Sequence, residues 1–355
     1  MDLKDFLSGN ETLFKEPIVL DYDYMPKLVP YRENEQREIA LAIKPLLSMR
    51  NGKNVFVYGN PGIGKTLACK HVIKEVEEKY DIYCFYINCW KRNTSYKIAL
   101  QLCEELDYPF IQNKKTDELF DVIKKEINKK AAVFVLDEID KLEELSFLYF
   151  LLEEIYRKSI ILITNNKEWL INLDSRIRSR LTPELLEFRN YNKEEIEGIL
   201  RHRLKYAFYE GVFQEDAFKL VVEKTFEKGD IRVGLYLMRE AGNNAEARSS
   251  KKITKEDVEI AIKKFADFSI KDKKDLDEDS NKILQIVKNN SGKKIGELFK
   301  IYQEQKGDSV YKTFQRKILK LEKAGFVKLK KIVGGAEGTT TIVNYAYKDL
   351  SDFQK

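Results

Sequence analysis

Short apolar runs alternate with amphipathic stretches through the first half of the chain. Runs such as Ala131–Leu136 and Ile160–Thr164 are continuous and strand-sized, whereas apolar residues between Glu33 and about Arg50 recur at helical spacing. The pattern predicts strands at 54–58, 82–88, 131–136 and 160–164 and helices at 33–50, 66–80, 95–106, 117–128 and 145–157. Strands that alternate with helices indicate βαβ units, an α/β fold and a parallel sheet covered on both faces.

The pattern changes after about Lys193, where only helical periods remain, and again after a charged segment. Four helices are predicted at 193–209, 214–226, 231–248 and 254–267. Lys271–Ser280 is almost all charge, which is typical of a linker. Beyond it, three short helical patterns precede two strand candidates, 325–333 and 340–347, in the order of a winged helix. Residues 1–30, with scattered apolar groups and three prolines, are predicted to form an extended arm laid over a domain.

Charge is unevenly divided along the 355 residues, a length that fits two or three domains. Residues 281–355 contain 16 Lys+Arg and 7 Asp+Glu, a net charge of +9, whereas the rest of the chain carries −4. A basic C-terminal part in an otherwise mildly acidic chain suggests that this part binds a polyanion. Charge alone leaves a lysine-rich solvated surface open as the alternative.

Membrane and metal-cluster roles find no support in the sequence. No apolar run approaches the roughly 20 residues of a membrane span, and the polar, acidic N-terminus is unlike a signal peptide. With four cysteines and two histidines, neither a disulfide scaffold nor a His-rich metal site is expected. We therefore expect a cytoplasmic protein with reduced, structural cysteines and no membrane partner.

A phosphate-binding loop is predicted at residues 59–66. The segment fits the pattern G-x-x-x-x-G-K-[ST] between a predicted strand and a predicted helix, the context that the motif requires. Glycines let backbone N–H groups cradle phosphate oxygens. The expected cofactor is ATP or ADP with Mg²⁺: Lys65 would reach the β- and γ-phosphates of ATP, and Thr66 would ligate Mg²⁺. A Gly-rich turn that matches by chance is the alternative. The residues assigned to the nucleotide here are Gly59, Asn60, Pro61, Gly62, Ile63, Gly64, Lys65 and Thr66.

Polar side chains follow two predicted strands, at the edge of a parallel sheet where ligands bind. Asp137 would hold Mg²⁺ directly or through water, and Glu138 would orient and activate the water that attacks ATP. Asn165, after the next strand, could touch the γ-phosphate or that water. An acidic loop and a turn-forming Asn pair are the alternatives.

Two arginine-bearing segments also point to phosphate. Arg176, Arg178 and Arg180 stand at alternate positions, and an arginine offered to a neighbour's γ-phosphate would stabilise charge in trans. Surface ion pairs are the alternative. Gly229-Asp-Ile-Arg232 opens a predicted helix, from which Arg232 could contact the γ-phosphate in cis.

Taken together, these motifs resemble an AAA+ P-loop ATPase, and within that class the archaeal origin-recognition and cell-division-control type of replication initiator. The resemblance covers nearly the whole chain and begins at Asp23–Glu35, which is similar to the family's Pro-x-Arg-Glu segment beside the adenine. It implies nucleotide contacts by Tyr31 and Arg32. It also places Trp90–Ser95 where such initiators carry a DNA-contacting insertion.

The resemblance assigns further nucleotide residues. Asn165 matches the family's sensor 1 position, Arg180 its trans arginine finger and Arg232 its sensor 2. Tyr191 and Arg203 match positions that the family uses for nucleotide. The expected catalytic set is then Lys65, Asp137, Glu138, Asn165 and Arg180, and the expected Mg²⁺ ligands are Thr66 and Asp137.

DNA contacts are expected from the basic C-terminal part. The predicted helix Ser309–Lys323 would enter the major groove, with Phe314, Ile318 and Leu319 on its apolar side. Gln and Arg side chains can contact base edges, whereas Lys mostly meets phosphate. The residues assigned to DNA are Lys312, Gln315, Arg316 and Lys320 on the helix and Lys328, Lys330 and Lys331 on a hairpin turned by Gly334 and Gly335. A winged helix that binds protein is the alternative.

The resemblance implies an ATP-dependent initiator that binds double-stranded origin DNA, helps recruit and load the replicative helicase, and hydrolyses ATP slowly as a switch. It also implies ATP-dependent self-association through Arg180 and a place on the nucleoid. Alternatives are an AAA+ DNA motor of the branch-migration type and a DNA-binding regulatory or signalling ATPase. The expected domains are an arm with an αβα nucleotide-binding domain (1–190), an all-α lid (191–270), a charged linker (271–280) and a winged-helix DNA-binding domain (281–355).

Overall fold

The computed structural model describes residues 12–274, 278–305, 307, 309–323, 326–332 and 340–345. The chain divides into two compact units, Met1–Ala261 and Ile262–Lys355. In the part of the chain that the structure describes, no helix is long and apolar enough to cross a membrane.

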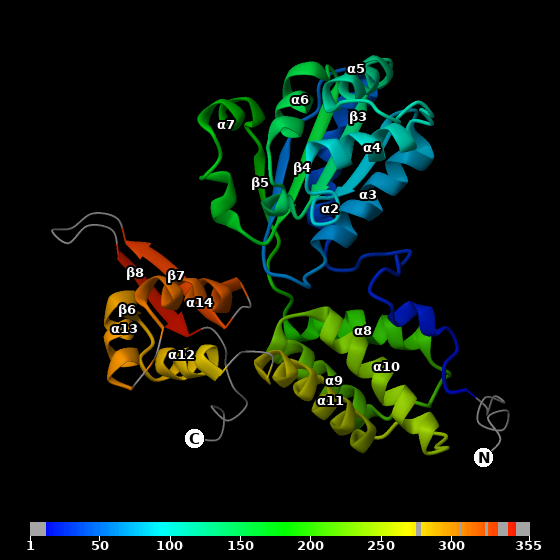
Figure 1. Cartoon of the computed structure of the whole chain (residues 1–355). Helices are drawn as coiled ribbons and strands as arrows, with labels where there is room; N and C mark the ends of the chain where they lie inside the picture. Colours follow the sequence, from blue (N-terminus) through cyan, green and yellow to red (C-terminus); the bar gives the residue numbers. More distant parts are fainter. Residues whose placement is uncertain are drawn as a thin grey trace. The chain divides into compact units, whose positions relative to one another are not determined.

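A five-stranded parallel sheet forms the centre of the first unit, with the strand order β2-β3-β4-β1-β5 (Figure 1). The strands are β1 (Val55–Tyr58), β2 (Tyr83–Asn88), β3 (Ala132–Asp137), β4 (Lys158–Thr164) and β5 (Glu184–Glu187). The three central strands are buried along their whole length, because helices cover both faces of the sheet. The predicted parallel α/β architecture is therefore confirmed.

Six helices flank this sheet: α2 (Glu33–Ile43), α3 (Lys65–Lys79), α4 (Ser95–Glu105), α5 (Thr116–Ile127), α6 (Ser146–Glu154) and α7 (Ser175–Leu181). Alternate strand residues, such as Phe56 and Phe134, share one core with the apolar sides of α4 to α7. The helix predicted at 33–50 stops at Ile43 and continues as a 3-10 helix, Lys44–Ser48, because Pro45 cannot donate to the helical ladder.

Four helices make the lid of the first unit: α8 (Lys193–Ala207), α9 (Glu215–Lys228), α10 (Ile231–Ala247) and α11 (Lys255–Lys274). Asn192 and Glu195 form a capping box that starts α8, and Gly229 ends α9 in the left-handed conformation. The border between the two units falls after Ala261, within α11, rather than after residue 270 as predicted. Most of the predicted linker is also helical, since 271–274 belong to α11 and 278–280 to α12; residues 275–277 lie outside the described range.

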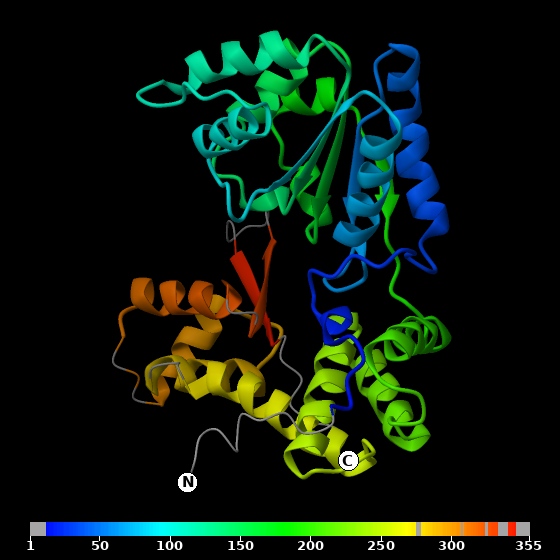
Figure 2. The same cartoon turned by 90° about the vertical axis from the view of Figure 1, so that its right-hand side faces the viewer.

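The N-terminal arm packs on the lid, but it is not wholly extended. It contains a 3-10 helix, η1 (Pro17–Leu20), whose Val19 and Leu20 are buried. Phe14 stacks on Phe208 with ring centroids 4.8 Å apart, and the Lys15 N–H donates to the Ala207 carbonyl at 2.8 Å. Figure 2 shows the arm beside the lid helices before it turns toward the sheet. The arm therefore ties the lid to the start of α2.

The second unit contains three helices and a small antiparallel sheet, the element order predicted for a winged helix. The helices are α12 (Glu278–Asn289), α13 (Ile295–Glu304) and α14 (Tyr311–Lys323), and the sheet order is β6-β8-β7, with β6 (Lys293–Lys294), β7 (Val327–Ile332) and β8 (Thr340–Tyr345). Tyr302, Phe314 and Ile318 are fully buried in its core. The turn between β7 and β8, which includes Gly334 and Gly335, lies outside the described residues.

Candidate functional site

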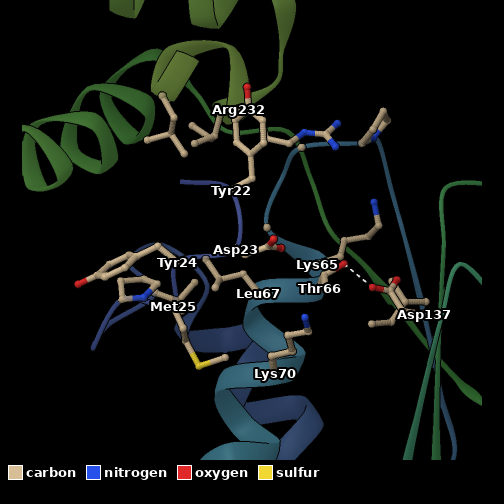
Figure 3. A pocket seen from close by; sticks show the side chains of 18 of the residues that line it. Tyr22, Asp23, Tyr24, Met25, Lys65, Thr66, Leu67, Lys70, Asp137 and Arg232 are labelled. Carbon is tan, nitrogen blue, oxygen red and sulfur yellow. Dashed lines mark hydrogen bonds between the residues drawn. The ribbon is translucent and has the colours of Figure 1, made fainter. Parts of the chain in front are cut away.

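A cavity of about 460 Å³ opens beyond the carboxyl ends of the parallel strands, within the size range of small-molecule sites. Its walls come from the phosphate loop and α3, from the ends of β3 and β4, from lid helices α8 and α10, and from the arm residues 22–30. Figure 3 shows arm side chains facing Lys65 and Thr66 across this space, with Arg232 reaching in from the lid.

The loop between β1 and α3 is closed by glycines in conformations that other residues avoid. Gly62 and Gly64 have φ of 73° and 88°. A Cβ built on Gly62 would lie 1.9 Å from a carboxylate oxygen of Asp230, so the lid packs directly against the bare backbone of the loop. The Ile231 N–H also donates to the Gly62 carbonyl at 3.2 Å. The loop is thus shaped for close backbone approach.

Lys65 lies at the start of α3, and its amine is held inside the loop. Its Nζ donates to the Gly59 and Asn60 carbonyls at 2.9 and 2.6 Å and to Asn165 Oδ1 at 2.8 Å. Burial lowers the pKa of Lys65 to about 8; the Asp137 charge opposes this shift, and Arg232 adds to it. An anion bound in the loop would favour the charged amine.

Asp137, at the end of β3, is 4% exposed and gathers hydroxyl groups around one oxygen. Its Oδ2 accepts hydrogen bonds from Thr66 at 2.8 Å and from Tyr86 at 2.7 Å. Carboxylate and hydroxyl oxygens are the ligands that Mg²⁺ prefers, so Thr66 and Asp137 form a donor set that fits this ion. The two residues come from α3 and β3 and meet where a phosphate-bound metal would lie.

Glu138 follows Asp137 in the left-handed conformation, with φ of 54°. Burial and the nearby charges of Asp137 and Asp140 raise the pKa of Glu138. A carboxylate with a raised pKa at the rim of a phosphate site is suited to accept a proton from water. Asn165, at the end of β4, completes this edge of the cavity.

Tyr191, Arg203 and Arg232, three residues assigned to the nucleotide from the sequence, line the cavity on the side of the lid. The Arg203 guanidinium donates to the Val19 carbonyl at 3.0 Å and lies 4.9 Å from the ring centroid of Tyr24. Arg232 forms a bidentate ion pair with Asp230, in which Nε donates to Oδ1 at 3.0 Å and Nη2 donates to Oδ2 at 2.6 Å. Both arginines are therefore positioned by protein partners at the cavity edge.

Tyr31 and Arg32, which the sequence assigned to the nucleotide, do not line the cavity. Arg32 is fully buried, and its donors are used on the Ile63 carbonyl, the Arg189 carbonyl and Glu35. The Tyr31 hydroxyl packs on the lid instead, 2.2 Å from where a Cβ of Gly198 would lie. Arg32 therefore joins the phosphate loop to the segment that leads into the lid.

Three loop residues assigned from the motif also fall outside the cavity lining, whereas Pro61, Gly62, Gly64, Lys65 and Thr66 line it. Ile63 is 1% exposed and anchors the loop in the core. Gly59 and Asn60 offer their carbonyls to Lys65, which is why they lie behind the amine rather than in the opening. Arg180 also lies outside the cavity, ion-paired with Glu153.

The resemblance placed the segment Asp23–Glu35 beside the adenine, but among its residues the sequence assigned Tyr31 and Arg32 to the nucleotide and not the arm side chains that form one wall. Tyr22, Asp23, Tyr24 and Met25 line the cavity, as does Lys70 from α3 (Figure 3). Tyr86 from β2 and Lys91 from the loop after β2 line it as well. The arm has no helical or strand period, because it packs through a few side chains against several elements. Alternation along β2 could have found Tyr86, since every second residue of a strand faces the same side.

The DNA-contact candidates lie on α14 and β7. Lys312, Arg316 and Lys320 are exposed and Gln315 is half-buried, along one stripe of α14. Leu319 was predicted on the apolar side, but it is 50% exposed and belongs to this stripe, because positions 315, 316, 319 and 320 are neighbours on a helix. Lys328 and Lys330 are exposed on alternate positions of β7, whereas the side chain of Lys331 lies outside what the structure describes.

Comparison with known families matches both parts of the first unit. The family described as the Cdc6 AAA+ ATPase-type lid domain matches residues 197–263, and an AAA domain matches residues 49–168. The chain is also 30% identical to the ORC1-type DNA replication protein 2 of Methanothermobacter thermautotrophicus, over 98% of this chain and 97% of that protein.

Solved structures give the same result for the whole chain. The Aeropyrum pernix ORC1 protein, solved in complex with DNA, superposes with a TM-score of 0.71 and 25% identity over 96% of this chain and 95% of that one. The Thermotoga maritima RuvB Holliday junction branch migration motor matches with a TM-score of 0.51 and 18% identity over 92% and 96% of the two chains, which shows a shared fold alone. This chain therefore belongs to the ORC1-type DNA replication proteins, the replication initiators of the origin-recognition and cell-division-control type, and it is an AAA+ ATPase.

Proposed function

We propose that this chain marks replication origins by binding double-stranded DNA through its C-terminal winged helix and its AAA+ module, under control of bound ATP. The observation that carries the proposal is the combination of a walled nucleotide cavity with an exposed basic stripe on α14. The Aeropyrum relative was solved with DNA, which supports the same activity here. An initiator acts on the chromosome, so a cytoplasmic, nucleoid-associated location is part of the proposal.

In the ATP-bound state, Lys65 exchanges its loop carbonyl partners for the β- and γ-phosphates. Thr66 and Asp137 would hold Mg²⁺, whose charge would offset the negative charge of phosphoryl transfer. Glu138 takes the proton of the attacking water, and Asn165 orients that water or the γ-phosphate. The two bonds between Arg232 and Asp230 give way to a contact between Arg232 and the γ-phosphate.

Arg180 serves a neighbouring protomer. Its side chain is 48% exposed and lies outside its own cavity, so it can reach a γ-phosphate only across an interface between two copies. Self-association is then ATP-dependent, because the γ-phosphate is the group that Arg180 contacts. Its present partner, Glu153, holds the guanidinium until that contact forms.

Hydrolysis is slow and acts as a switch between DNA-bound states, during which the replicative helicase is recruited and loaded. The walls of the cavity support this view. Hydrogen bonds of Arg32 and Arg203 join the arm to the loop and to the lid, and this bracing of the cavity walls would slow nucleotide exchange and therefore turnover. A motor that hydrolyses ATP quickly would need faster nucleotide exchange, and a more open site would favour it.

On DNA, α14 enters the major groove and β7 follows the backbone. Arg316 and Gln315 contact base edges, Lys312 and Lys320 contact phosphates, and Leu319 offers an apolar surface to a thymine methyl group. Lys328, Lys330 and Lys331 are assigned to the backbone beside the groove. The exposed Trp90 and the cationic Lys91 and Arg92 give the AAA+ module a second contact with the duplex.

The experiment that tests the proposal is footprinting with ATP on DNA that tiles the source genome. Discrete protected sites near a replication start are expected, and Glu138→Gln, which keeps bound ATP, should protect the same sites. Lys65→Ala serves as the nucleotide-free control, and Arg316→Ala should lose the sites. Uniform weak protection, or a preference for four-way junctions with closed hexamers in light scattering, would instead support the regulatory ATPase or the branch-migration motor.

A further inference from the structure

The loop after β2 is connected to the magnesium ligand set by side chains on one face of that strand. Asn88 pairs in register with Asp137 across the parallel ladder, and Tyr86 lies two residues earlier on the same face. Tyr86, Asn88 and Asp137 all line the nucleotide cavity, and so does Lys91 from the loop. The end of β2 therefore lies between the loop and Asp137, the metal ligand at the end of β3.

Asn88 holds the beginning of the loop. Its Oδ1 accepts the backbone N–H groups of Trp90 and Lys91 at 3.0 and 3.1 Å, and its backbone carbonyl accepts those of Lys91 and Arg92. Because Oδ1 is used in this way, the amide N–H₂ is the group left to donate, and it belongs to the same face of β2 as Tyr86, two residues earlier. Any displacement of residues 90–92 thus acts on Asn88 directly.

Tyr86 continues the connection to Asp137. Its hydroxyl donates to Asp137 Oδ2 at 2.7 Å, the same oxygen that accepts from Thr66. The Lys70 amine lies 4.0 Å from the centroid of the Tyr86 ring, and Lys70 follows Thr66 by one turn of α3, so the ring is held between the helix and the strand. Asp137 Oδ1 is used by the Glu138 N–H, so both carboxylate oxygens are fixed by neighbours.

The same loop is also supported from the segment that follows Asp137. The Cys89 N–H donates to the Asp137 carbonyl at 2.8 Å, and the Glu143 N–H donates to the Asn93 carbonyl at 2.9 Å. The Lys141 amine lies 5.4 Å from the ring centroid of Trp90. Yet Trp90 itself is 66% exposed, so its outer surface is available to a ligand.

We propose that Tyr86 and Asn88 are positioning residues, and that they transmit contact between duplex DNA and the Trp90–Ser95 loop to Asp137, so that DNA changes the affinity of the site for Mg²⁺-nucleotide. DNA that engages Trp90 and Lys91 moves the N–H groups that Asn88 accepts. Asn88 then shifts the Tyr86 hydroxyl, and the Asp137 carboxylate turns with it. The coupling rests on the proposed DNA binding; the positioning of Asp137 by Tyr86 does not.

The test compares the full-length wild type with Tyr86→Phe, using a fluorescent ADP analogue in EDTA and across a Mg²⁺ titration. With the affinity of each protein in EDTA as its own baseline, Tyr86→Phe should raise the Mg²⁺ concentration for half-maximal tight binding about 10-fold, which is the size of effect seen when a partner of a metal ligand is lost. Tyr83→Phe is the matched control, because Tyr83 lies on the same strand and its hydroxyl contacts Glu126, away from the site. An unchanged Mg²⁺ midpoint in Tyr86→Phe would overturn the positioning role.

The second arm repeats the titration with saturating duplex. DNA should shift the Mg²⁺ midpoint of the wild type and of Tyr83→Phe, but not that of Tyr86→Phe or Asn88→Ala. The affinity for DNA, measured by anisotropy in EDTA, should be the same for the wild type and Tyr86→Phe. A shift that persists in both variants, or no shift in a wild type that binds DNA, would overturn the coupling. If the wild type binds no duplex, the proposed function fails and the coupling fails with it, whereas the first arm still decides the role of Tyr86.

Discussion

At the residue scale, the nucleotide site is held by the same polar groups that ATP would use. Lys65 donates to two loop carbonyls and to Asn165, and Arg232 is paired with Asp230. Nucleotide binding therefore exchanges partners and does not simply fill an empty space. The free energy of binding then depends on the charge state of each group that changes partner.

Lys65 makes this dependence measurable. Burial lowers the pKa of Lys65 to about 8 in the free protein, and bound phosphate favours the charged amine, so binding above pH 8 must also take up a proton. We expect ATP affinity to be constant between pH 7 and about 8 and to fall by up to about tenfold per pH unit above it. The terminal phosphate does not titrate in this range, because its second pKa is about 6 and it is fully ionised above pH 8.

The measurement is the dissociation constant of a fluorescent ATP analogue from pH 7 to 9.5, with unfolding followed in parallel to show that the protein stays folded. Affinity that remains constant up to pH 9.5 would contradict a buried Lys65 with a lowered pKa.

At the element scale, Arg32 joins three segments that are far apart in the sequence. It precedes α2, its guanidinium bonds the Ile63 and Arg189 carbonyls, and it stacks 3.9 Å from the Tyr191 ring centroid. Removing it leaves two buried carbonyls and Glu35 without their donor. We expect Arg32→Ala to lower the free energy of unfolding of the first unit by about 3 kcal/mol.

Arg32→Lys should be nearly as damaging, because an ammonium cannot reproduce the planar fork of the guanidinium. Urea unfolding of the full chain measures both effects, and nucleotide affinity should fall along with stability. Arg37→Ala is the control, since Arg37 is exposed on α2. Equal urea midpoints for the Arg32 and Arg37 variants would show that the contacts of Arg32 contribute little to the stability of the first unit.

Sequence patterns predicted the helices and most strands, and they were clearest for the strands that are buried on both faces; β5 was missed. β1, β3 and β4 are continuous apolar runs because helices cover them on two sides, so their period is unambiguous. β5 (Glu184–Glu187) is an edge strand with charged ends and little burial, and its sequence alone gives no strand signal. The arm residues Tyr22 to Met25 were missed for a related reason, since they contact several elements and follow no period.

At the scale of the whole chain, the net charge of +5 conceals two opposite parts. Residues 281–355 carry +9 and the remainder −4, and the exposed cations of α14 fall in the positive part. The nucleotide site lies entirely in the first unit. The nucleotide site and the proposed DNA surface on α14 should therefore be separable by mutation, so that each can be altered while the other serves as an internal control.

Salt dependence of duplex binding tests this division. Each cation that meets a phosphate releases about one counterion, so Lys312→Ala and Lys320→Ala should each reduce the slope of log K against log salt by about 1 and weaken binding to all sequences alike. Arg316→Ala should also relax sequence preference, by about 1–3 kcal/mol at the base it contacts. Lys219→Ala, an exposed charge removed from α9 of the lid, should leave the slope unchanged. Because these changes lie outside the nucleotide cavity, ATP affinity should be constant across the series. If the slope of log K against log salt stays the same in all α14 variants, the DNA surface belongs to another part of the chain.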